Sequence, residues 1–247
     1  MTTRLHIRLL GEFRLDYGDT PVATVNTPRL QSLLAYLVLH RHAPQARAHL
    51  AFLMWPDSAE AQARTNLRQQ FHLLRHALPE ADRFLQADAH TLQWRSEAPF
   101  SLDVADFESA TAPNNASLMA LQEAIDLYRG DLLPSCYEEW ILPERERLRQ
   151  RFIEALERLI GLLENEHDYA TAIRYAQRLV KWDPLHELAH CRLMGLYIQA
   201  GDRAAALRQY QACVRVLQKE LGVSPSATTT ALFERIRQGV GAETQEE

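Results

Sequence analysis

The sequence has few of the features that mark membrane, secreted or fibrous proteins. Of its 247 residues three are cysteines and nine are glycines, and only two of the 27 basic residues are lysines. The longest strictly apolar run, Leu33 to Leu39, is far shorter than the roughly 18 residues that a membrane-spanning helix needs. Charges interrupt the apolar residues of the N-terminus, which excludes a signal-peptide core. An odd cysteine count without a C-x-x-C pair is typical of reduced thiols, so we expect a soluble, cytoplasmic protein that does not bind membranes.

The composition that remains is that of a globular protein. Hydrophobic residues make up 47% and charged residues 24% of the chain, with a formal net charge of −5, which suits one large domain or two of ordinary size. Residues 1–105 carry a net charge of +1 and the remainder −6. Near that division, residues 96–103 contain proline and serine without helical periodicity. We therefore predict one domain over residues 1–98, a second over 99–240, and a disordered acidic tail over 241–247.

In the first half the hydrophobic pattern changes from period two to helical spacing. Alternation predicts strands at about 5–9 and 13–17, and Pro21 opens a third strand that ends near Val25. Thr27-Pro28 is a helix-start signal, a capping residue followed by proline at the first helical position. The elements predicted after it are helices at about 28–38, 46–54 and 58–78, the last with Ser58 as its N-cap, and a two-stranded hairpin at 84–95.

The second half has helical spacing throughout and contains a repeat. The eight residues from His167 align with the eight from Gly201 at an offset of 34, which pairs Ala172 with Ala206. A helix–turn–helix period of about 34 residues is the tetratricopeptide signature, in which small residues let paired helices approach closely. Further helices are predicted at about 104–112, 117–129, 138–164 and 226–238.

Six segments, in this order, resemble those of the bacterial antibiotic-regulatory (SARP-type) transcriptional activators. They are RLQSLLAYLVLHR, WPDSAEAQARTNLRQQFHLLRHAL, LDVADFESA, LYRGDLL with EEW and ERERLR, DPLHELAHCRLMGLYIQAGDRAAALRQY, and ELGVSPSATTTALFERI. The resemblance covers about residues 5–238. It implies an α+β, OmpR-like winged helix-turn-helix domain followed by an all-α, tetratricopeptide-like bacterial transcriptional activator domain (BTAD).

The same resemblance implies a function. Members of this family bind double-stranded DNA sequence-specifically, commonly at direct repeats near promoters, and recruit RNA polymerase; their second domain serves dimerisation and polymerase contact. Many members continue into an ATPase or sensor module, but this sequence contains no GxxxxGK[ST] phosphate loop. We therefore expect the compact two-domain form, a non-enzymatic transcription activator that needs no cofactor.

The helix predicted at 58–78 carries a basic face beside an apolar stripe that runs from Leu67 to Leu78. At helical spacing the basic residues of this face fall within an arc of about 80°. In a winged helix this helix enters the DNA major groove while the hairpin follows the backbone or minor groove, and guanidinium groups bind phosphates or guanine edges with two hydrogen bonds. The predicted DNA-binding residues are Arg64, Thr65, Arg68, Gln69, His72 and Arg75 on the helix, with Arg29, Arg47 and Arg95 as phosphate contacts.

An alternative to a DNA interface stays open at this point. Arginines at this spacing also form solvated helix faces, paired here with Asp57, Glu60 or Asp82. The acidic total and Asp88 in the hairpin both oppose nucleic-acid affinity. In that case the chain is a protein–protein adaptor whose winged helix has lost DNA binding and whose repeat domain is the working surface.

A third function class comes from His186 to His190, which spell HExxH, the spacing with which zincins bind zinc. The segment follows Asp183-Pro184 at the start of a repeat helix, where Glu187 favours the positive helix end and the histidines are ordinary surface or packing groups. No third ligand follows at zincin spacing, so we predict no metal site. Zinc in the purified protein would contradict that prediction.

The remaining cysteines and tryptophans are predicted to be structural. We expect Cys191 and Cys213 to be small core residues and Cys136 to lie in a loop. Trp55, Trp94 and Trp182 are expected to be core or boundary anchors, and Trp140 is expected to pack against a neighbouring helix rather than meet a partner. No G-x-S-x-G sequence nominates a nucleophile.

Overall fold

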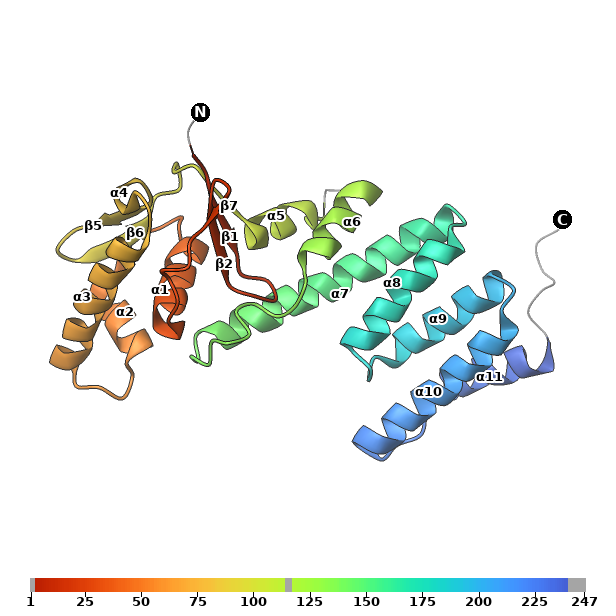
Figure 1. Cartoon of the computed structure of the whole chain (residues 1–247). Coiled ribbons are helices and arrows are strands. Elements are labelled where there is room, and N and C mark those ends of the chain that lie inside the picture. The colour runs from red at the N-terminus through yellow and green to blue at the C-terminus, as the bar shows by residue number, and fades with distance from the viewer. Residues whose placement is uncertain (1–2, 114–116, 240–247) are drawn as a thin grey trace. The chain divides into compact units, whose positions relative to one another are not determined.

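The computed structural model describes residues 3–113 and 117–239, which fold into two compact units (Figure 1). The first unit contains the described residues before 114 together with 123–150, and the second contains 117–122 and 151–239. Helices α6 (Leu118–Leu127) and α7 (Ile141–Asn165) contribute residues to both units. All strands of the described residues belong to the first unit.

A four-stranded sheet in the order β3–β2–β1–β7 forms one part of the first unit. Strands β1 (Leu5–Arg8), β2 (Arg14–Tyr17) and β3 (Thr20–Pro21) pair antiparallel. The three predicted N-terminal strands are thus confirmed, although the third ends at Pro21 rather than near Val25.

The fourth strand, β7 (Phe100–Leu102), pairs parallel with β1 and aligns Leu102 with Ile7. Residues 96–103 have no helical periodicity in the sequence, and the second part of this stretch forms a strand that the pattern does not predict. Three residues are too few to show a period of two, and the strand forms because β1 offers a free edge to it.

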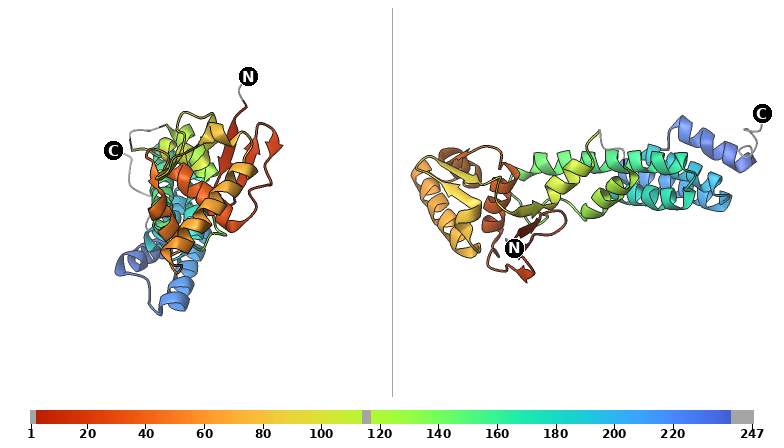
Figure 2. Two further views of the ribbon diagram at one scale, coloured as in Figure 1. Left: turned by 90° about the vertical axis from the view of Figure 1, so that its left-hand side faces the viewer. Right: turned by 90° about the horizontal axis from the view of Figure 1, so that it is seen from above.

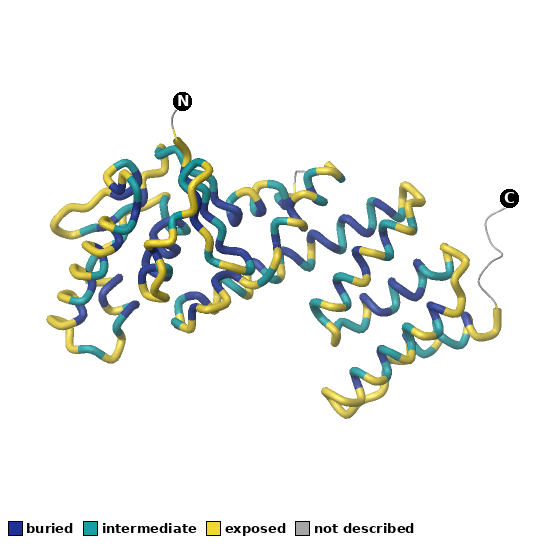
Figure 3. Tube along the Cα trace, viewed as in Figure 1, coloured by how far each residue is buried: buried dark blue, intermediate teal, exposed yellow. Residues whose placement is uncertain are grey.

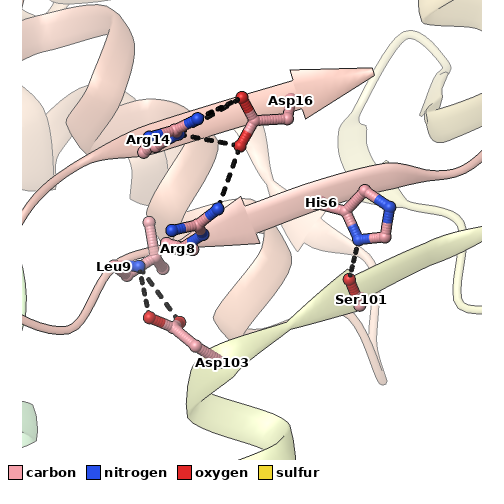
Figure 4. Close-up of polar contacts among 7 residues, drawn as sticks. All are labelled: His6, Arg8, Leu9, Arg14, Asp16, Ser101 and Asp103. Carbon is pink, nitrogen blue, oxygen red and sulfur yellow. Dashed lines mark hydrogen bonds and ion pairs between the residues drawn. The ribbon is translucent and has the colours of Figure 1, made fainter. Parts of the chain in front are cut away.

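Two buried carboxylates, Asp16 and Asp103, bind neighbouring groups of this sheet (Figure 4). Asp16 is buried between Arg14 and Arg8, with closest nitrogen–oxygen distances of 2.9 and 3.3 Å, and hydrogen bonding from Arg14 holds the pKa of Asp16 below its ordinary value. Asp103, the first residue of α5 (Asp103–Ala110), accepts hydrogen bonds of 2.9 Å from the N–H groups of Leu9 and Leu10. The start of α5 is thereby attached to the end of β1.

Three helices and a short fourth complete the N-terminal part of the first unit. They are α1 (Pro28–Leu39), α2 (Arg47–Met54), α3 (Glu60–Ala77) and α4 (Ala81–Phe84). The predicted start of α1 is confirmed, because the Thr27 side chain accepts a hydrogen bond from the N–H of Leu30 and Pro28 occupies the first turn. The predicted N-cap of α3 is wrong: Ala59 takes that position and makes no side-chain capping bond.

The predicted hairpin is present and is extended by a strand that the sequence pattern does not show. β5 (Leu85–Ala87) and β6 (Thr91–Trp94) pair antiparallel, and β4 (Gln45–Ala46), directly before α2, pairs with the other edge of β6. This three-stranded sheet links the start of α2 to the hairpin.

A segment between α6 and α7 is built into the first unit as well. Leu132 forms an antiparallel bridge with Leu10, and the N–H of Leu133 donates to the carbonyl of Leu9 over 2.8 Å. Gly130 lies directly against Gly11, since a Cβ added at Gly130 would stand 2.8 Å from the Cα of Gly11. Glycine is required at this close backbone approach.

The second unit is helical. The later part of α7 is followed by α8 (Tyr169–Trp182), α9 (Glu187–Gln199), α10 (Arg203–Leu221) and α11 (Ala227–Gln238). Neighbouring helices from α8 to α11 are in contact; they are the blue-green to blue helices towards the C-terminus in Figure 2.

The 34-residue repeat is confirmed in local structure. Asp168 and Asp202 cap α8 and α10, and each accepts a hydrogen bond from the N–H three residues later, over 3.1 and 2.8 Å. Ala172 and Ala206 are fully buried at equivalent positions of the two helices. The repeated sequence thus makes the same cap twice and buries an alanine at the equivalent position of each helix.

The predicted fold class, an α+β winged helix-turn-helix region followed by helical repeats, is confirmed. The boundary expected between residues 98 and 99 stays a prediction, and the compact units divide the chain differently because residues 123–150 pack with the N-terminal region. The tail predicted at 241–247 lies outside the described residues. Within the described ranges no helix has the length and apolar character to cross a membrane.

Candidate nucleic-acid interface

Helix α3 has one apolar and one polar face. Ala63, Leu67, Phe71 and Leu74 are buried, and the helix packs against α1 and α2. Buried and exposed positions alternate along it in Figure 3. The exposed residues include all six predicted on this helix: Arg64, Thr65, Arg68, Gln69, His72 and Arg75.

A groove of about 880 Å³ lies beside this polar face. Its walls come from α3, from the start of α2 and from the turn between β5 and β6, which we call the wing turn (Asp88–His90). The predicted residues that line it are Arg47, Arg64, Thr65 and Arg68. His90 lines it too and was not predicted, because its position depends on the register of the hairpin.

Arg68 is the basic side chain of this groove that is freest to bind a ligand. It is exposed, and its Nη2 donates to the hydroxyl of Thr65 over 3.1 Å. Nowhere in residues 3–113 and 117–239 does it have an acidic partner. The hydroxyl of Thr65 in turn donates to the carbonyl of Ala61 over 3.0 Å, which fixes its rotamer beside the guanidinium.

The other two arginines on α3 form ion pairs. Arg64 pairs with Glu60 one turn earlier, and Arg75 pairs with Asp82. Glu60 and Asp82 are two of the partners expected if the arginines form a solvated helix face, so the ion pairs support that alternative for Arg64 and Arg75. All four side chains are largely exposed, and exposed ion pairs contribute about 1 kcal/mol or less.

The C-terminal part of the face lies outside the groove. His72 stacks edge-on against His76 with ring centroids 4.3 Å apart. Together with Arg75 these rings line a second depression of about 750 Å³, closed on its other side by residues 80–83. Gln69 lines neither hollow.

Arg47 is half-buried rather than extended into solvent. Its Nε donates to the carbonyl of Asp88 over 2.9 Å, and its guanidinium carbon lies 5.7 Å from the centroid of the Phe71 ring. Burial lowers its pKa from the ordinary value, and the charge of Asp88 acts in the opposite direction. Arg47 therefore joins α2, α3 and the wing turn.

Arg29 and Arg95 do not line the groove. The guanidinium of Arg29 donates to the carbonyl of Met54, lies 5.1 Å from the centroid of the Trp55 ring and has its Nε 3.9 Å from Glu138. Arg95 is exposed directly after β6. Their role as phosphate contacts stays a prediction. The guanidinium of Arg29 is already in contact with Met54, Trp55 and Glu138 of the protein itself.

The carboxylate of Asp88 stabilises the wing turn. It accepts hydrogen bonds from the N–H groups of His90 and Thr91, both over 2.7 Å, and from the Thr91 hydroxyl over 2.8 Å. These bonds hold the pKa of Asp88 below its ordinary value. The acidic residue in the hairpin is thus explained by the turn that it forms.

The HExxH segment makes internal contacts. His190 is buried; its Nε2 lies 3.0 Å from the carbonyl of Pro184, and the amide of Gln209 donates to its Nδ1 over 2.7 Å, so that Nε2 carries the proton. Burial lowers the pKa of His190. Glu187 accepts hydrogen bonds from Ser226 and Thr229 at the start of α11. The segment therefore connects helices of the second unit, and the described residues contain no cluster suited to a metal.

The three cysteines and the four tryptophans are all buried or half-buried. Cys213 is fully buried as predicted, while Cys191 is half-buried and hydrogen-bonds to Thr229 over 3.1 Å. Trp94 is fully buried as a core anchor. Trp140 packs edge-on against Tyr36 at 5.1 Å between centroids, and its indole N–H donates to Glu138 over 2.8 Å, which confirms packing within the fold.

Comparison with known proteins gives a family match over the second half. Residues 102–237 match the model of the bacterial transcriptional activator domain. The regulatory protein AfsR of Streptomyces coelicolor is 25% identical over 242 residues, which cover 95% of this chain and 24% of AfsR. The transcriptional regulatory protein MoaR1 of Mycobacterium tuberculosis is 25% identical over 252 residues, covering 94% of this chain and 79% of MoaR1. The chain thus spans about a quarter of the length of AfsR and most of MoaR1.

A solved structure shares the fold. The structure of Mycobacterium tuberculosis EmbR in complex with a low-affinity phosphopeptide superposes with a TM-score of 0.74 at 21% identity, covering 98% of this chain and 67% of that one. At this identity the similarity concerns the fold alone.

Proposed function

Because residues 102–237 match the family model, the chain belongs to the bacterial transcriptional activator domain family, and we propose that it is a sequence-specific DNA-binding regulator of the SARP type. In this proposal α3 enters the major groove and the hairpin at 84–95 acts as the wing. Activation through RNA polymerase and pairing of two copies through the repeat domain belong to the same proposal and rest on the family resemblance.

The observation that carries the proposal is the exposed basic face of α3 beside the groove. Arg64, Thr65 and Arg68 line the groove from one helix, and Arg68 has no acidic partner in the described residues. Arginine donates in a planar fork that matches phosphate oxygens and the O6/N7 edge of guanine. A duplex could therefore be bound here by positioning contacts and read by the same side chains.

The ion pairs on α3 are compatible with this proposal. Arg64 and Arg75 would exchange exposed carboxylate partners for phosphates. Giving up each exposed pair costs about 1 kcal/mol or less, whereas phosphate contacts also gain from the release of condensed counterions.

The test replaces Arg64, Arg68 and Arg75 together by alanine. We expect the variant to bind a duplex selected by the wild type more weakly. In a plot of log K against log salt concentration its slope should be smaller by about 0.9 for each phosphate that it no longer binds. The measurement is fluorescence anisotropy at several salt concentrations. Affinity and slope equal to those of the wild type would remove α3 from the interface.

A matched control removes the same charge elsewhere. Arg208, Arg215 and Arg235 are exposed on α10 and α11, so their triple alanine variant has the same net charge as the α3 variant. We expect it to bind the duplex with nearly the wild-type slope. An equal loss of affinity in both variants would mean that only net charge matters.

A second candidate function is a protein–protein adaptor. The ion pairs of Arg64 and Arg75 favour it, because two of the three arginines on this face already have carboxylate partners and need no nucleic acid to neutralise them. In this case the repeat domain would bind the partner and wild-type protein would show no preference among duplexes.

A further inference from the structure

Arg47 makes two hydrogen bonds to the wing turn and one contact with α3. Its backbone N–H donates to the carbonyl of His90 over 2.8 Å and its side-chain Nε donates to the carbonyl of Asp88 over 2.9 Å. The guanidinium also lies over the Phe71 ring of α3. A single residue therefore holds both ends of the turn to the core of the winged-helix region.

The wing turn has no buried side chain to fix its position: Leu92 and Trp94 of β6 are buried, but residues 86–90 are all exposed. β5 has three residues, β6 has four and β4 has two, and a short two-stranded hairpin is at best marginally stable by itself. The bonds made by Asp88 are within the turn, so they set its shape without attaching it to the helices. The turn itself is attached by the β4–β6 pairs and by Arg47.

The contacts of Arg47 also affect the charge of the groove. Asp88 is the one carboxylate among the described residues that line the groove. The Arg47 guanidinium lies close enough to interact with this carboxylate and with Arg68. The positive charge of Arg47 offsets the negative charge of Asp88 within the groove that Arg68 also lines.

We propose that Arg47 is a positioning residue of the DNA interface, which holds the wing turn at a fixed separation from α3, rather than the phosphate contact that the sequence predicts. The inference rests on the proposed function, since the groove between the wing turn and α3 is the site that it shapes. The bond from Nε to a backbone carbonyl and the contact with the Phe71 ring set the position of the guanidinium, so its place in the groove is fixed by the wing turn and α3 and not by a phosphate.

The test compares Arg47→Ala and Arg47→Lys with Arg68→Ala in the full chain. Lysine retains the charge, and therefore a phosphate contact, but it has no donor at the Nε position and no planar group to lie on Phe71. Two quantities are measured: the salt dependence of binding to a duplex selected by the wild type, and the hydrogen exchange of the amides in residues 85–94.

For both Arg47 variants we expect amides of the wing to exchange about tenfold faster or more and affinity to fall, with a salt slope close to that of the wild type. For Arg68→Ala we expect unchanged wing exchange and a slope smaller by about 0.9. A slope reduced by about 0.9 in Arg47→Ala, restored by Arg47→Lys, with unchanged wing exchange, would overturn the proposal.

The exchange measurement also separates the two levels of inference. If the wild type binds no duplex, the proposed function fails, while faster wing exchange in the Arg47 variants would still show that Arg47 fixes the turn. If the alanine variant does not fold, the charge-retaining lysine variant decides, because wild-type wing exchange in that variant contradicts the positioning role.

Discussion

At the scale of single residues, Asp103 combines burial with a dense set of hydrogen bonds. Its carboxylate accepts from the N–H groups of Leu9, Leu10 and Val104, and it is 7% exposed. Burial raises its pKa to about 6, although the three N–H groups act in the opposite direction. Desolvation therefore outweighs the hydrogen bonds, and the folded protein takes up a proton here at a higher pH than the unfolded chain.

This shift predicts a pH dependence with a definite sign. Between pH 3.8 and about 6 the folded state holds the proton more strongly than the unfolded one. Stability from this group is fully present below pH 3.8 and is lost as the pH rises through about 6, by at most about 3 kcal/mol. Urea unfolding at several pH values should show this fall in the wild type relative to Asp103→Asn, which does not titrate. Parallel profiles for the two proteins would contradict it.

Residue-level prediction from the sequence succeeded where helical periodicity decides exposure. The six predicted residues of α3 are all exposed because the apolar stripe fixes which side of the helix is buried. Arg47 was placed on the correct helix, but its contacts depend on Asp88, 41 residues later. Such a contact leaves no trace in local spacing.

At the scale of elements, the two repeat helices α8 and α10 depend on matching N-caps. Replacing Asp168 or Asp202 by alanine removes the acceptor for the N–H three residues later, and we expect each change to lower the free energy of unfolding by about 1 kcal/mol. Asp57→Ala, at an exposed turn position, is the control and should change stability by less than about 0.5 kcal/mol. Chemical denaturation followed by circular dichroism measures all three, and losses of stability no larger than that of the control would refute the capping role.

Elements were predictable in proportion to their length. The helices and the repeat follow from patterns many residues long, whereas β4 and β7, with two and three residues, were missed. Both strands exist because a neighbouring strand offers hydrogen-bond partners. Pairing of this kind is decided by the fold and not by the segment itself.

At the scale of the whole molecule, part of the sequence that matches the activator domain packs in the same compact unit as the winged-helix region. Residues 130–133 lie within the range matched by the family model, yet they bond to Leu9 and Leu10 of the first unit. The sequence boundary near residue 98 separates two patterns of hydrophobic spacing. It could not reveal that the chain returns to the sheet, because this contact spans more than 100 residues.

Gly130→Ala tests this dependence. The added Cβ would stand 2.8 Å from the Cα of Gly11, so backbone must shift, and we expect the free energy of unfolding to fall by about 1–3 kcal/mol. Hydrogen exchange should show increased opening of β1 and β2, the strands on either side of Gly11, in this variant. In Gly195→Ala the Cβ meets nothing within 4 Å in the middle of α9, and this control should be neutral or stabilising by up to about 1 kcal/mol. Equal stability of the two variants would contradict the account of the first unit.

The proposed function requires that the polar face of α3 binds duplex DNA with sequence preference. Its most direct test is selection from a pool of random duplexes with the wild-type protein and with the Arg64, Arg68 and Arg75 triple alanine variant. We expect an enriched sequence for the wild type, and no enrichment or a relaxed sequence for the variant. A wild-type protein that enriches no sequence would contradict the claim and favour the adaptor function.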